Sequence, residues 1–161
     1  MKKIVSILLA FFTLIAFTAV PIFADTAPLE ENSIVTFFDN GSYLVQTVSE
    51  QPHLYSARST TYTKTGNTNF DYYNKNNEHL FRFTITGTFH VVEGVSSTCT
   101  DSTYSYSIYD SSWKLDSAST WKSDNTAYGN AVFKDKFLFA TIETVNIDAK
   151  VICDIYGNIS F

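Results

Sequence analysis

The sequence has little of what marks several common protein classes. Its 161 residues include three prolines, one methionine and two cysteines, and only 17% of them are charged. A chain with 45% hydrophobic residues is too apolar for general disorder, and its scarcity of Ala, Leu, Glu and Lys excludes a helical bundle. No Lys or Arg cluster occurs beyond residue 3, and the formal net charge is −5. These features argue against nucleic acid or an anionic membrane surface as the main partner.

The N-terminus has the pattern of an export signal. Two lysines precede an uncharged, largely apolar stretch from Ile4 to Phe23, and Asp25 follows the small residue Ala24. This order predicts a secretory signal peptide over residues 1–24 and a secreted protein with no stable membrane span after cleavage. A stretch of this length can also span a bilayer, so an uncleaved N-terminal anchor is the alternative.

The two cysteines, Cys99 and Cys153, allow a single pairing. Exported proteins meet an oxidising environment, so the sequence predicts a disulfide bond between them. On the chain-entropy description, closing this loop would stabilise the fold by roughly 4 kcal/mol. No histidines lie near the cysteines to complete a zinc site, and no metal or cofactor is expected.

Apolar and polar residues alternate along most of the chain after residue 24. The alternation from Leu80 to Val92 predicts a long, half-buried strand. Gly87 falls in its apolar row, which predicts either a bulge or a gap filled by a large ring from the facing sheet. The same period from Phe137 to Cys153 predicts a second long strand, with Phe137 on its buried face.

Several long strands need a second layer to cover their apolar faces, so the predicted fold class is all-β. We expect an antiparallel two-sheet β-sandwich with a short N-terminal hairpin, whose turn is marked by Asn40-Gly41. The predicted organisation is a signal peptide over 1–24, the hairpin and a linker over 25–57, and the sandwich domain over 58–161. Because an isolated hairpin is marginal in water, the segment 25–57 is expected either to dock on the sandwich or to form a pro-segment.

The order of several short motifs carries a resemblance. These motifs are Phe38-Asp39-Asn40-Gly41-Ser42-Tyr43, Thr86-Gly87-Thr88-Phe89, Cys99, Tyr109-Asp110-Ser111-Ser112-Trp113, Gly129-Asn130-Ala131, Cys153-Asp154, Gly157-Asn158 and Ser160. In this order they resemble small exported β-rich proteins of Gram-positive bacteria of the Firmicutes. The resemblance covers most of the mature chain and implies secretion and a β-rich fold, but no activity and no functional residues.

Catalytic chemistry has weak support in the sequence. His53 and His79 fall in predicted loops, His90 lies on the polar face of its strand, and no G-x-S-x-G motif is present. Four aspartates fall near predicted strand ends: Asp101, Asp110, Asp116 and Asp124. They have no calcium-loop spacing, and surface solubility is the preferred explanation for them. We therefore predict no catalytic residues and no enzyme.

Aromatic residues are in excess, with ten Tyr, two Trp and 14 Phe. Exposed Tyr and Trp side chains on a β-sheet are well suited to stack on sugars or to contact proteins, and Trp121 is the ring that we most expect to be exposed. Arg82 and His90 end a polar row on the long strand and are the other candidate binding residues.

Three functions are compatible with these features. The preferred hypothesis is a secreted, non-catalytic binding module for a glycan, a cell-wall component or a protein. The first alternative is a secreted antagonist, similar to a bacteriocin or a small toxin. The second alternative is a small secreted hydrolase.

Overall fold

The computed structural model describes residues 33–50, 60–138 and 140–161, and these residues form nine β-strands and no helix. The strands are β1 (Ser33–Phe37), β2 (Tyr43–Glu50), β3 (Thr61–Tyr73), β4 (His79–Val92), β5 (Ser96–Ile108), β6 (Trp113–Ser123), β7 (Thr126–Phe137), β8 (Ala140–Cys153) and β9 (Ile159–Ser160). No membrane-crossing helix is therefore found in this described part of the chain. The predicted signal peptide, residues 51–57 of the predicted linker and His53 lie outside the described residues.

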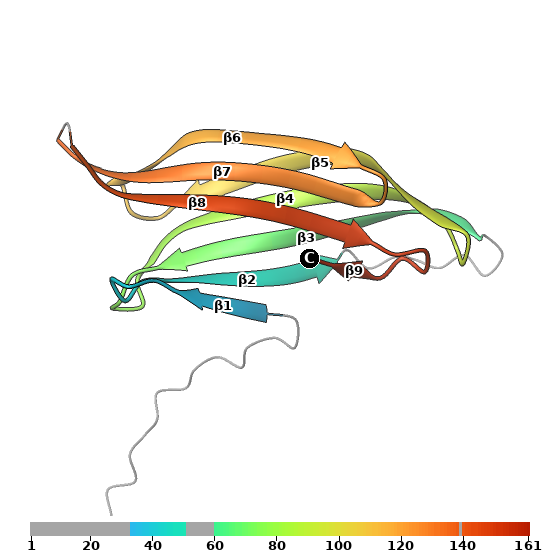
Figure 1. The fold of residues 1–161 in the computed structure, drawn as a ribbon, viewed down its shortest axis with the longest axis horizontal. Coiled ribbons are helices and arrows are strands. Elements are labelled where there is room, and N and C mark those ends of the chain that lie inside the picture. Colours follow the sequence, from blue (N-terminus) through green and yellow to red (C-terminus); the bar gives the residue numbers. More distant parts are fainter. Residues whose placement is uncertain (1–32, 51–59, 139) are drawn as a thin grey trace, which may run out of the picture.

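The strands form two antiparallel sheets that follow the order of the chain. The first sheet has the order β1-β2-β3-β4-β5 and the second has the order β6-β7-β8-β9. The two sheets pack face to face, which confirms the predicted all-β sandwich (Figure 1). The second sheet is the narrower one, because β9 pairs with β8 at only two positions.

The core lies between the sheets and is rich in aromatic rings. The predicted strand from Leu80 to Val92 is confirmed as β4, and its apolar row is buried. Phe81 of β4 stacks on Phe133 of β7, with ring centroids 4.0 Å apart. Trp113 packs against Phe81 and is 4% exposed. The period of two therefore correctly predicted which face of β4 is buried.

At Gly87 the first of the two predicted alternatives is observed, because the strand register shifts at a bulge between Thr88 and Phe89, next to the glycine. No large ring of the facing sheet fills the gap; the ring of Phe89 from the same strand lies there, together with Ala127 of β7. One detail of the predicted strands is wrong. Phe137 is 69% exposed and belongs to the end of β7, because the second long strand begins only at Ala140.

The N-terminal hairpin is part of the larger sheet, since β2 pairs with β3 along its whole length. Four side chains also join its turn to the sandwich. Asn40 donates to Glu143 of β8 at 2.9 Å, and the hydroxyls of Ser42 and Tyr72 lie 2.5 Å apart. Tyr72 in turn donates to Glu143. Of the two alternatives that the sequence left open, the structure shows the docked hairpin.

The predicted disulfide is absent from the structure, in which Cys99 and Cys153 are both free, buried thiols. Each thiol donates instead to a nearby carbonyl oxygen, that of Asp101 at 3.2 Å and that of Asp154 at 3.6 Å. Burial raises the pKa of both thiols. The prediction relied on export and on an even cysteine count, neither of which places two sulfur atoms within bonding geometry.

Candidate functional site

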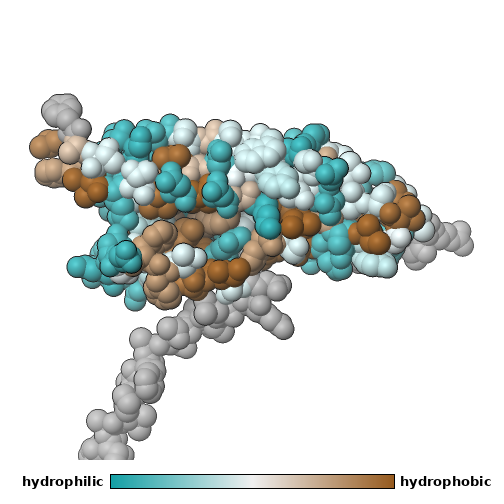
Figure 2. All heavy atoms as spheres, in the orientation of Figure 1, coloured by the Kyte–Doolittle hydropathy of each residue, from teal (hydrophilic) through white to brown (hydrophobic). Residues whose placement is uncertain are grey.

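An open groove of about 660 Å³ lies beside β8. Its lining comes from both sheets and from the C-terminal residue: Ile34, Gln46, Trp121, Tyr128, Gly129, Asp148, Ala149, Lys150 and Phe161. Figure 2 shows apolar surface between β8 and the strands β1 and β2, where the narrower sheet leaves the larger one uncovered. The groove is thus a consequence of the unequal widths of the two sheets.

Two rings form the aromatic wall of this groove. Trp121 on β6 lies directly opposite Tyr128 on β7, and the rings stack with centroids 5.5 Å apart and planes 4° apart. Trp121 is 48% exposed, as the sequence predicted. A cross-strand pair of this kind is held by the rigid ladder beneath it, so it presents a preformed apolar surface.

Polar side chains with unused hydrogen-bonding capacity lie in the same groove. Lys150 on β8 is opposite Tyr128, and Asp148 follows on the same face of β8. Gln46 reaches the groove from β2. Among the interactions of the described residues, none involves the charged end of Lys150 or Asp148 or the amide of Gln46. These groups can therefore bond to a ligand without first breaking a bond within the protein.

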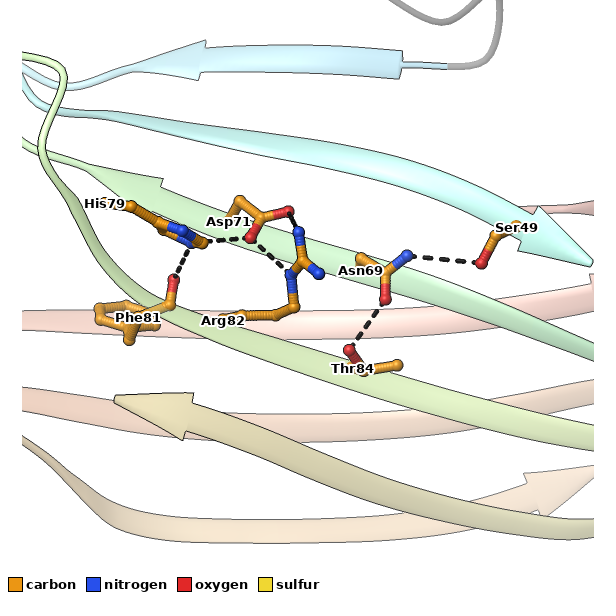
Figure 3. Close-up of polar contacts among 7 residues, drawn as sticks. All are labelled: Ser49, Asn69, Asp71, His79, Phe81, Arg82 and Thr84. Atoms are coloured by element: carbon orange, nitrogen blue, oxygen red, sulfur yellow. Dashed lines mark hydrogen bonds and ion pairs between the residues drawn. The ribbon is translucent and has the colours of Figure 1, made fainter. Parts of the chain in front are cut away.

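The structure places the other two candidate residues far from this groove, on the outer face of the larger sheet. Arg82 makes a bidentate contact with Asp71, through Nε at 2.6 Å and a terminal nitrogen at 2.9 Å (Figure 3). His79 Nε2 also lies 2.7 Å from the Asp71 carboxylate. His90 is exposed at the other end of β4. The hydrogen bonds to Asp71 raise the pKa of Arg82, and its guanidinium is already engaged.

The polar row between Arg82 and His90 is also partly bonded within the sheet. Thr84 donates to the side-chain oxygen of Asn69 at 2.8 Å, and Thr86 donates to that of Asn67 at 2.7 Å (Figure 3 shows the first pair). These side chains connect β4 to β3 across the surface. The row therefore stabilises the pairing of β3 with β4. It has fewer side chains with unused hydrogen-bonding groups than the groove has.

Sequence reasoning missed a second aromatic feature. Five rings from different parts of the chain form a row across the outer face of the larger sheet: Phe37, Tyr43, Tyr73, His79 and Tyr109. Neighbouring centroids are 4.2 to 5.7 Å apart. His79, expected in an exposed loop, is in fact a half-buried member of this row at the start of β4. Only the strand register brings these residues together, so no local signal could have found the row.

The remaining acids do not gather into a site. Asp116 bonds to Lys134 at 2.7 Å, which lowers the pKa of its carboxyl group. Asp110 accepts a hydrogen bond from the backbone of Ser112. Within the described ranges, no group of three or more His, Cys, Asp or Glu side chains has the geometry to hold a metal ion.

The chain matches no known protein family model, no curated protein and no solved structure.

Proposed function

We propose that this protein is a non-catalytic binding module that acts outside the cell and binds a glycan in the groove beside β8. The observation that carries the proposal is the composition of the groove wall. The stacked pair of Trp121 and Tyr128 stands next to Asp148 and Lys150, whose charged ends have no partner within the described chain. The location outside the cell rests on the predicted signal peptide.

This combination matches the two kinds of surface that a sugar ring presents. The C–H face of a sugar packs on an exposed aromatic ring, which removes apolar surface from water. Its hydroxyl groups need donors and acceptors at the edge of the ring, and a carboxylate and an ammonium group supply both. Because all four side chains stand on paired strands, little ordering is needed on binding.

The test is a binding measurement with Trp121→Ala. Labelled protein is applied to a glycan array and sedimented with insoluble peptidoglycan, and the affinity for each positive sugar is then measured by calorimetry. Covering an aromatic side chain contributes roughly 1.5–3 kcal/mol. We therefore expect the variant to bind about tenfold to a hundredfold more weakly.

His90→Ala is the matched control, because His90 is an exposed ring on the opposite sheet. This variant should bind as the wild type does, and both variants should keep the wild-type circular dichroism spectrum. Equal affinity of wild type and Trp121→Ala for every bound glycan would exclude the groove as the binding site.

A further inference from the structure

The edge of β8 beside the groove is largely unpaired. On its other side β8 pairs with β7 along almost its whole length, whereas on the groove side β9 pairs only with Ile152 and Cys153. The strand continues back to Ala140 without another strand partner among the described residues, and of its edge-facing groups the carbonyl oxygen of Lys150 accepts a hydrogen bond from the Thr68 hydroxyl at 2.9 Å. Such an edge presents backbone N–H and C=O groups that can pair with another strand.

The register shows which groups face the groove. In an antiparallel strand, the N–H and C=O groups of one residue point to the same neighbour, and successive residues alternate. The backbone N–H of Cys153 donates towards the β6–β7 turn, at Asn125. The backbone groups of the residues that alternate with Cys153 therefore point to the open edge. These residues include Asn146 and Asp148, and also Ile152, whose backbone pairs with β9.

β9 already occupies the beginning of this open position as an extended strand. Ile159 and Ser160 pair with β8, and Phe161 continues in the same direction into the groove. Val48 of β2 and Phe161 line the same small hollow beside β9, and Gln46 and Ile34 line the groove next to it. A strand that continued the line of β9 would thus have a largely apolar floor on one side and solvent on the other.

The far end of the groove is closed by side chains. Glu143 of β8 accepts hydrogen bonds from Asn40 and Tyr72, and these bonds tie β8 to the β1–β2 turn. Between Glu143 and Lys150 there is room for about five or six residues at about 3.4 Å per residue. The open stretch therefore fits a short extended segment.

From this geometry we propose that the β8 edge binds an extended polypeptide segment of a partner protein. The segment runs antiparallel to β8, as β9 does, and carries apolar side chains at every second position, which face Gln46 and Ile34. Its backbone pairs with the edge-facing groups of Asn146 and Asp148. This surface shares Gln46 and Ile34 with the groove of the proposed glycan site, but it rests on the backbone of β8 and not on the rings of Trp121 and Tyr128, so the inference does not depend on the proposed glycan binding.

The first test places such a segment at the edge within one chain. Five residues, Thr-Val-Thr-Val-Thr, are added after Phe161, and amide hydrogen exchange is measured by NMR. Covalent attachment gives a high effective concentration. We expect the amides of Asn146 and Asp148 to exchange at least about tenfold more slowly than in a chain extended by Gly-Ser-Gly-Ser-Gly. Equal exchange rates in the two extended chains would overturn the proposal.

The second test separates backbone pairing from apolar contact. The free peptide acetyl-Thr-Val-Thr-Val-Thr-Val-Thr-amide is titrated into the unextended protein, in parallel with a copy N-methylated at alternate residues. Both peptides have the same side chains, but the copy lacks half of the donors. The methyl groups are placed on the residues whose N–H groups would face β8. The copy should therefore not bind, and it should not change the NMR chemical shifts of Asn146 and Asp148. Equal binding of the two peptides would overturn the pairing.

Discussion

At the scale of single residues, the difference between Arg82 and His90 shows how much depends on neighbouring strands. Both are polar residues on the outer face of β4, and both are equally plausible binding residues in the sequence. In the structure, however, Arg82 neutralises Asp71, which is 5% exposed, while His90 is exposed. Removing the guanidinium takes two charge-assisted hydrogen bonds from this buried carboxylate and leaves His79 as its remaining side-chain partner among the described residues.

We therefore expect Arg82→Ala to lower the free energy of unfolding by about 2 kcal/mol, because a charge-assisted pair is broken at a half-exposed position. His90→Ala should change it by less than about 0.5 kcal/mol. Urea denaturation followed by tryptophan fluorescence measures both. If the two variants were equally stable, the ion pair with Asp71 would contribute nothing to the fold.

At the scale of elements, the N-terminal hairpin depends on a small hydrogen-bonded cluster as well as on strand pairing. Tyr72 of β3 is fully buried and bonds to Ser42 in the hairpin turn and to Glu143 on β8. Burial, followed by the hydrogen bond to Glu143, raises the pKa of Tyr72 to about 12. Through its two hydrogen bonds, the neutral phenol of Tyr72 connects the hairpin turn with β3 of the first sheet and β8 of the second.

A pH dependence follows from this shift. In the unfolded chain Tyr72 ionises near pH 10, but in the folded protein it stays neutral up to about pH 12. Its contribution to stability is therefore complete below pH 10 and is lost as the pH rises from 10 to 12. Denaturation curves over this range should show a steeper loss of stability for wild type than for Tyr72→Phe. Parallel curves for the two proteins would contradict the shift.

At the scale of the whole molecule, the sandwich is closed along one side and open along the other. On the closed side, Thr120 and Lys122 of β6 donate to carbonyl oxygens of β5, and Ser102 of β5 donates to the carbonyl oxygen of Tyr128. On the open side, only β9 lies between β8 and β2. The β8 edge lies on this open side, and the aromatic wall stands beside it on the outer face of β6 and β7. The unequal sheets are therefore the feature that connects the fold with the proposed strand-binding edge.

The export prediction also belongs to the whole molecule. When the full chain is expressed in a Gram-positive host, we expect a product in the medium whose N-terminus is Asp25, because the apolar stretch precedes a small residue at the cleavage position. N-terminal sequencing and intact mass spectrometry of the culture fractions measure this. A product that keeps residues 1–24 and sediments with the membrane would show that the segment is an anchor.

The sequence by itself determined the fold class and the buried face of its most regular strand. Alternation over thirteen residues is a local property, and it placed the apolar row of β4 in the core because successive side chains point to opposite faces of a strand, so that the apolar row packs while the polar row meets the solvent. The exposure of Trp121 could also be predicted, because polar neighbours surround it in the chain.

The tertiary structure decided how residues on different strands meet. The row of rings from Phe37 to Tyr109 and the pairing of Arg82 with Asp71 depend on strand register, which the period of two does not specify. The free thiols of Cys99 and Cys153 depend on three-dimensional placement, whereas the expected disulfide relied on count and compartment alone. The groove could not be predicted either, because it arises where one sheet is wider than the other, and sheet width is a property of the assembled molecule.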